Sequence, residues 1–101
     1  MNKAISTTKA PAAIGPYSQA IEGNNTVYVS GQLPIDPATG EFAVGGIQAE
    51  ARQSLTNISN ILAEAGLTMA NVAKVTVLLA DIKDFAAVNE VYQEFFQKDF
   101  I

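Results

Sequence analysis

Two turn-like segments carry polar side chains at the ends of expected strands, where a ligand could be bound. Gly15-Pro16 fixes a sharp entry into a strand and presents Tyr17 at its start. A second strand ends in Ser30-Gly31, where the glycine lets a ligand approach backbone N–H groups closely and the serine hydroxyl can donate a hydrogen bond. Each segment alone is more often an ordinary strand end or turn, so neither specifies a site by itself.

Two further segments lie at expected helices. Asn89 follows the apolar Val88 and can project from the edge of a helix toward a cleft, although a solvated asparagine is the plain alternative. Gly45-Gly46 precede a helix start, where N–H groups can bind anions, but neither the Walker nor the dinucleotide spacing of glycines is present. Asn89 therefore remains a candidate, and we expect no phosphate site at the glycine pair.

The residue types that are absent exclude several kinds of catalytic site. The chain has no Cys and no His, which removes Ser-His-Asp and Cys-His nucleophilic systems, histidine metal sites and zinc fingers. The carboxylates are dispersed and form no pair suited to acid–base work, so we interpret them as a solvated surface. We accordingly expect no metal site.

Charge and hydrophobicity limit the partners. The net charge is −4 and the six Lys and Arg residues form no cluster, which argues against binding to nucleic acid. No apolar run has the length of a signal peptide or approaches the ~18 residues of a membrane span, so we expect a cytoplasmic protein without membrane contact. Residues 1–101 form one expected domain, and their 49% hydrophobic content predicts contact with another copy of the chain.

The apolar pattern predicts the elements that would position these candidates. Residues 17–21 and 26–30 are β-prone and flank a Gly/Asn cluster, which predicts a hairpin, and residues 34–40 predict a loop. Apolar residues recur every three or four positions over 47–65, which predicts a helix there, and Gly66 follows its last turn. Its polar surface is expected at Gln48, Arg52, Gln53, Asn57, Asn60 and Glu64.

The second half of the chain predicts a strand and a helix. Residues 72–79 are β-prone, alternate, and are nearly apolar on both sides at their end, which indicates a central strand. Asp84 is a plausible N-cap for a second helix, and Lys98 lies near its end. Because a strand and a helix normally lead to a further strand, the apolar residues near Ile101 predict a sheet completed by another chain, or residues that are missing. The buried face of the helix is expected at Phe85, Val88, Tyr92 and Phe95 or Phe96.

Several segments act together as a family signature. They are residues 10–20 (APAAIGPYSQA), 30–34 (SGQLP), 36–40 (DPATG), 51–57 (ARQSLTN), 74–77 (KVTV), 84–85 (DF) and 88–92 (VNEVY). In this order and spacing they closely resemble the RidA (YjgF, endoribonuclease L-PSP-like) family. One segment alone would be weak support, but several independent segments in register make a chance match very improbable. The resemblance covers essentially the whole chain.

The resemblance implies a fold and an assembly. Members of the family have an α+β subunit similar to trimeric chorismate mutase, in which two helices pack on a β-sheet. The family's homotrimer places the sheets inward around a threefold axis and the active sites in clefts between subunits. Relative to this pattern the chain stops at Ile101, and the usual last two strands are missing.

The resemblance also implies an activity that needs no cofactor. Water attacks the imine carbon of 2-iminobutanoate or 2-iminopropanoate, and ammonia and a 2-keto acid are released. Carried over position by position, Ser30 and Gly31 match residues near the substrate, and Tyr17 and Asn89 match catalytic residues that shape the cleft.

The family's arginine and glutamate, which hold the substrate carboxylate and the attacking water, belong to the two missing strands. Arg52 is the chain's single arginine and does not match that arginine. Whether this chain is an enzyme is therefore left open, and the alternative is a non-catalytic module that binds small carboxylates or a protein partner. The endoribonuclease label of the family is disfavoured by the net charge of −4.

Overall fold

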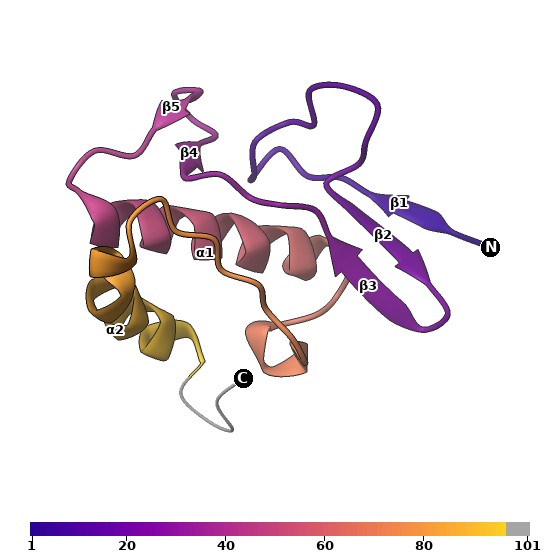
Figure 1. Ribbon diagram of the computed structural model, residues 1–101. Helices are drawn as coiled ribbons and strands as arrows, with labels where there is room; N and C mark the ends of the chain where they lie inside the picture. The colour runs from indigo at the N-terminus through magenta and orange to yellow at the C-terminus, as the bar shows by residue number, and fades with distance from the viewer. Residues whose placement is uncertain (97–101) are drawn as a thin grey trace.

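The computed structural model describes residues 1–96 and contains two helices, a three-stranded sheet and a two-stranded ribbon (Figure 1). The sheet lies toward one end of the long helix, and the second helix lies toward the other end (Figure 1). The predicted α+β class is therefore confirmed. The strands are β1 (Lys3–Ile5), β2 (Ala20–Gly23), β3 (Thr26–Val29), β4 (Ile35–Asp36) and β5 (Glu41–Phe42). The helices are α1 (Ile47–Glu64) and α2 (Phe85–Phe95), and η1 (Met69–Asn71) and η2 (Ile82–Asp84) are 3₁₀ turns.

The predicted hairpin is the pair β2–β3. Its antiparallel register places Ile21 opposite Tyr28, and Asn24 and Asn25 form the turn with φ values of 51° and 60°. Asparagine tolerates this left-handed conformation, and two such residues give a turn whose twist matches the strands. Strand β2 begins at Ala20 and not at residue 17 as predicted, because the preceding residues follow a bend at Gly15-Pro16.

Helix α1 matches its predicted span and end. Gly66 adopts a φ of +79° after the last turn. Its N–H donates to the Ala63 carbonyl at 3.0 Å, and the Leu67 N–H donates to the Leu62 carbonyl at 2.8 Å. These two bonds are the Schellman pattern, which satisfies carbonyls that the helix itself leaves unpaired.

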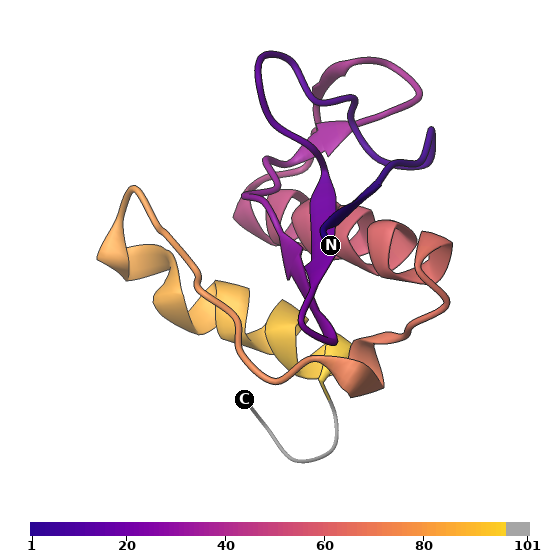
Figure 2. The same ribbon diagram turned by 90° about the vertical axis from the view of Figure 1, so that its right-hand side faces the viewer.

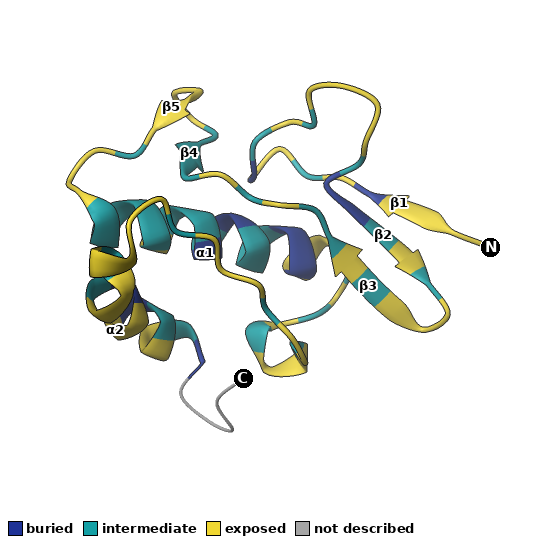
Figure 3. Cartoon of the chain, viewed as in Figure 1, coloured by how far each residue is buried: buried dark blue, intermediate teal, exposed yellow. Residues whose placement is uncertain are grey.

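Two apolar clusters include residues of α1. The buried residues of α1 lie in the middle and toward the C-terminal end of the helix (Figure 3). Toward the sheet, Ile61 is fully buried and packs with Ile5, Ala10 and Ala20. Toward α2, Leu55 packs in a second cluster. The buried partners in that cluster are Val91 and Phe96, and the partly buried ones include Ala51, Ile58, Met69, Val72, Val75, Tyr92 and Phe95. The long helix is thus the element that joins the sheet to α2.

Asn57 was expected on the polar surface of α1, and the structure shows that this prediction is wrong. The side chain is fully buried, and its Nδ2 donates to the Leu33 carbonyl at 3.2 Å and to the Ile35 carbonyl at 2.9 Å. Its Oδ1 accepts a bond of 2.9 Å from Gln53. A buried amide is tolerated where its donors and acceptor are paired. Asn57 therefore links α1 to the start of β4 and to the residues just before it through hydrogen bonds.

The expected central strand over residues 72–79 is not formed. This segment runs past α2 as irregular chain without a strand partner among residues 1–96 (Figure 2). Val77 and Leu78 are 47% and 89% exposed. A strand needs a neighbour to pair its backbone N–H and C=O groups, so a β-prone sequence without one stays irregular.

Helix α2 follows its predicted position with two differences. Asp84 stands at the N-cap position, but its side chain makes no capping bond, and Asp81 instead accepts from the Lys83 N–H at 2.9 Å. Phe85 was expected to be buried and is 56% exposed, because it opens the helix beyond the part that contacts α1. Val88 is buried as predicted, and Lys98 lies outside the described residues.

The helices of residues 1–96 include none with the length and apolar content that crossing a membrane requires.

Replacing Asn57 with Ala tests whether its hydrogen bonds link α1 to the chain around Leu33 and Ile35. The change leaves two backbone carbonyls without their donor, and we expect the free energy of unfolding to fall by about 1–3 kcal/mol in urea denaturation. Gln53→Ala, which removes one bond to Asn57, is the matched control and should cost less than half as much. Equal losses in the two variants would contradict this role.

Candidate functional site

The candidate residues Tyr17 and Ser30 line one hollow on the surface of the β2–β3 hairpin, which we call the hairpin hollow. It is open to solvent and has a volume of about 490 Å³. Its lining is Pro16, Tyr17, Ser18, Ala20, Ile21, Tyr28, Val29 and Ser30. The lining has two phenols and two hydroxyls, and it has no carboxylate, lysine or arginine.

Tyr17 is placed by the bend that precedes β2. Gly15 adopts a φ of +118°, which favours glycine, and the Tyr17 N–H donates to the Gly15 carbonyl at 2.9 Å. The phenol oxygen accepts a bond of 3.3 Å from the Ile14 N–H. The phenol therefore keeps its own proton for another acceptor. Tyr17 is 53% exposed and lines the hairpin hollow.

Ser30 follows β3 and is bound to the chain that precedes β2. Its N–H donates to the Gln19 carbonyl at 3.0 Å, and its Oγ lies 3.0 Å from the Gln19 carbonyl and 3.1 Å from the Ser18 carbonyl. A hydroxyl has one proton, which these two carbonyls share. The Ser30 proton is therefore engaged within the chain, and the lone pairs of Oγ are what the side chain has left for a further hydrogen bond.

Gly31 is exposed next to Ser30. A Cβ built on Gly31 would have no atom of the described chain within 4 Å, and its φ lies outside the left-handed region. The fold therefore does not need glycine here for conformation or for packing. The open space agrees with the prediction that a ligand can approach the backbone at this point.

Asn89 lies elsewhere in the structure. It is exposed on α2 and lines a second hollow of about 260 Å³, which we call the helix hollow. The lining of the helix hollow is Val75, Val77, Leu79, Phe85, Val88, Asn89 and Tyr92. Burial raises the pKa of the Tyr92 phenol, which keeps it neutral at physiological pH. One copy of the described chain thus does not bring Asn89 together with Tyr17 and Ser30.

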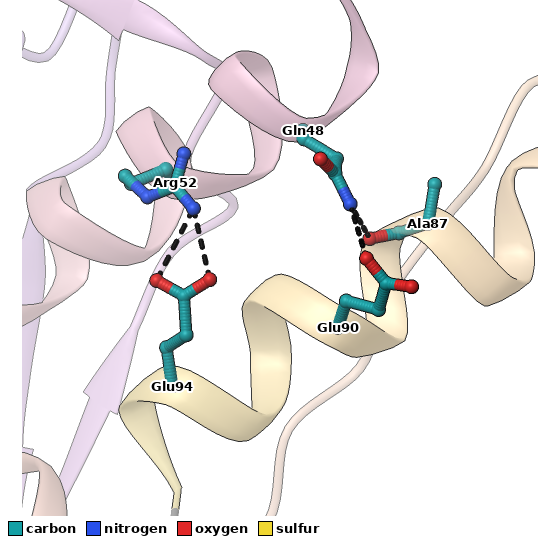
Figure 4. Close-up of polar contacts among 5 residues, drawn as sticks. All are labelled: Gln48, Arg52, Ala87, Glu90 and Glu94. Carbon is teal, nitrogen blue, oxygen red and sulfur yellow. Dashed lines mark hydrogen bonds and ion pairs between the residues drawn. The ribbon is translucent and has the colours of Figure 1, made fainter.

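The single arginine is engaged between the helices (Figure 4). Arg52 of α1 donates to both carboxylate oxygens of Glu94 of α2, at 2.9 and 3.1 Å. One turn earlier, Gln48 donates to the Glu90 carboxylate at 2.9 Å and to the Ala87 carbonyl at 3.1 Å. These bonds link α1 to α2, and Arg52 lines neither hollow. Within residues 1–96 no three acidic side chains gather in a way that could hold a metal ion.

Sequence reasoning missed Tyr28, which lines the hairpin hollow. The signal was present, since Tyr28 and Ser30 are two residues apart in the predicted strand 26–30, and strand alternation gives such residues the same side. It also missed the burial of Gln19, which is 4% exposed. No periodicity marks Gln19, because it precedes the strand and its partners come from a loop.

Three comparisons relate this chain to known proteins. The family model for endoribonuclease L-PSP matches residues 7–100. A 2-iminobutanoate/2-iminopropanoate deaminase of Capra hircus is 58% identical, and the match covers 99% of this chain and 73% of the relative. The protein of the same name from Homo sapiens is 51% identical over the same shares.

Solved structures agree with the fold. A putative endoribonuclease of Thermotoga maritima has a TM-score of 0.93 and 45% identity, and the match covers 97% of this chain and 77% of that one. The structure of E. coli TdcF with bound serine has a TM-score of 0.89 and 45% identity, over 95% and 75%. The family match and these likenesses have one explanation: the chain belongs to the endoribonuclease L-PSP family, which is the RidA family, and it has that family's fold.

Proposed function

We propose that the chain hydrolyses small 2-imino acids, such as 2-iminobutanoate and 2-iminopropanoate, to 2-keto acids and ammonia. The observation that carries this proposal is the 51–58% identity to relatives named for that reaction, which extends over 96–99% of this chain. The hairpin hollow is the site that we assign to it, because Tyr17 and Ser30 both line it and the exposed Gly31 follows Ser30 directly.

The hydrolysis has two steps, the addition of water and the departure of ammonia. Water adds to the imine carbon: its oxygen bonds to the carbon, one of its protons goes to the imine nitrogen, and the C=N bond becomes a single bond. In the resulting carbinolamine the hydroxyl proton passes to the nitrogen as the C–N bond breaks, so that ammonia leaves and the C=O bond of the keto acid forms. A site without a strong acid or base contributes to these steps mainly by positioning the water and the imine.

The hollow supplies groups suited to that positioning. The lone pairs of Ser30 accept the N–H of the imine, because the serine proton is shared by the Gln19 and Ser18 carbonyls. The Tyr17 phenol, which accepts from the Ile14 N–H, donates a hydrogen bond to the imine nitrogen. Gly31 follows Ser30 directly, and the empty space at its Cβ position leaves room for a substrate to approach the backbone there.

The proposed assembly is a homotrimer in the cytoplasm. Tyr17 and Asn89 line different hollows, so a site that uses both takes them from different copies of the chain. Exposed apolar side chains support the assembly, since a contact between copies would cover them. Among them, Tyr28 is 64%, Val77 is 47% and Leu78 is 89% exposed.

A second candidate function is the binding of small carboxylic acids without turnover. It is favoured by the lining of the hairpin hollow, which has no carboxylate to act as a base. One related structure, E. coli TdcF, is described with bound serine. Titration with 2-ketobutanoate, followed by NMR, would detect such binding in the absence of any imine hydrolysis.

Turnover of freshly formed imine tests the proposed function. We would generate 2-iminobutanoate from threonine with a pyridoxal-phosphate-dependent dehydratase and measure the formation of 2-ketobutanoate. The chain should accelerate hydrolysis above the spontaneous rate, and Ser30→Ala should reduce the acceleration by about tenfold, since it removes one bond to the substrate. A spontaneous rate with the native chain, beside activity of the human deaminase as a positive control, would contradict the proposal.

Two glycines offer a matched pair of substitutions. Both Gly31 and Gly40 have empty space at the Cβ position, but only Gly40 has a left-handed φ, of +74°. Gly31→Ala should keep or raise the free energy of unfolding by up to about 1 kcal/mol and reduce turnover, because its methyl group occupies the approach to the backbone. Gly40→Ala should lower stability by about 1 kcal/mol and leave turnover at native levels. The reverse pattern would remove Gly31 from the site.

Arg52→Gln separates the helix contact from substrate binding. The Arg52–Glu94 pair is about half exposed, with side chains 49% and 53% exposed, so its loss should change the free energy of unfolding by less than about 1 kcal/mol. KM for 2-iminobutanoate should not change. A rise in KM of tenfold would show that Arg52 holds the substrate carboxylate, which would overturn the placement of the site in the hairpin hollow.

A further inference from the structure

The side chain of Gln19 forms hydrogen bonds with the backbone of the loop between β1 and β2. Its Oε1 accepts from the Thr7 N–H at 2.7 Å, and its Nε2 lies 3.0 Å from the Thr7 carbonyl, 3.3 Å from that of Ala10 and 2.7 Å from that of Pro11. With 4% exposure, the side chain is enclosed by this loop. Since a buried amide is costly unless its groups are bonded, these contacts fix residue 19 relative to residues 7–11.

The backbone carbonyl of Gln19 is bonded to Ser30, one of the two candidate residues of the hairpin hollow. The Gln19 carbonyl accepts from both the N–H and the Oγ of Ser30, each at 3.0 Å. Tyr17 lies two residues earlier, within the loop that the Gln19 side chain closes. The Gln19 side chain does not line the hairpin hollow. It therefore stands behind both site residues and touches neither the hollow nor a ligand in it.

We propose that Gln19 is a positioning residue that sets the location of Ser30 relative to Tyr17. The mechanism has two parts: the buried amide fixes the backbone of residue 19, and that backbone fixes the direction of the Ser30 hydroxyl. A displacement of about 1 Å at reacting groups can lower a rate by a factor of ~100, so a fixed backbone matters to a site that works by orientation. The catalytic consequence rests on the proposed function, whereas the positioning itself does not.

Asn60 provides the control for a purely structural role. Its Nδ2 donates to the Lys9 carbonyl at 2.8 Å, so it also anchors the loop of residues 7–11. This bond is exposed and has no connection to Ser30. Loss of Asn60 therefore loosens the loop without releasing Ser30, and Gln19 and Asn60 can be distinguished in one experiment.

The test compares Gln19→Leu, Gln19→Asn and Asn60→Ala in the full chain. Hydrogen exchange of the Ser30 amide, measured by NMR, should accelerate about tenfold or more in Gln19→Leu relative to the amides that pair β2 with β3. Asn60→Ala should leave the Ser30 amide at its native rate. Gln19→Asn keeps an uncharged amide that is one methylene group shorter, so it buries no charge and should fold even where Gln19→Leu does not. It draws the amide away from the loop carbonyls, and should also accelerate exchange.

Turnover of 2-iminobutanoate supplies the second readout. In the Gln19 variants we expect kcat to fall about tenfold or more with KM changed less than twofold, and in Asn60→Ala neither constant should change. Native exchange at Ser30 in both folded Gln19 variants, or equal effects of Asn60→Ala, would overturn the positioning role. If the native chain itself shows no turnover, the proposed function fails, and the exchange of the Ser30 amide alone still decides the role of Gln19.

Discussion

The burial of α1 between two apolar clusters is the constraint on which the other elements depend. One side of the helix packs on the sheet through Ile61, and the other side packs on α2 through Leu55. Neither the short strands nor the 11-residue α2 would bury enough apolar surface alone, so both gain their position from the long helix. The polar contacts at Gln48 and Arg52 then fix the register of α2 along α1 (Figure 4).

Two buried amides extend that constraint to the candidate site. Asn57 fastens the segment that follows Ser30-Gly31 to α1, and Gln19 fastens the bend that precedes β2. The site lies between these fixed points, where Ser30 is bound to the main chain of Gln19. Its side chains are therefore oriented before any ligand arrives, which lowers the entropy lost on binding. This arrangement suits a reaction that depends on orientation more than on acid–base groups.

Local patterns predicted the elements that are defined by neighbours in sequence. The helical period of α1, the turn at Asn24-Asn25 and the ending at Gly66 all depend on interactions within a few residues, and each was predicted. The failures involve partners distant in sequence. Residues 72–79 have a strand's composition but no strand beside them among residues 1–96, and Asn57 has a polar side chain whose partners are 22 and 24 residues away. The same limit applies to the candidate site. Sequence motifs selected Tyr17, Ser30 and Asn89 as candidates, but only the structure showed that Asn89 lines a separate hollow.

The central claim is that a small 2-keto or 2-imino acid binds in the hairpin hollow. An NMR titration of the isotopically labelled chain with 2-ketobutanoate, the stable product, tests it most directly. The account predicts that saturable shift changes are concentrated at the amides of Tyr17, Ser30 and Gly31. Changes concentrated instead along α1 and α2 around Arg52 would contradict it, and would place the carboxylate-binding site on the helices.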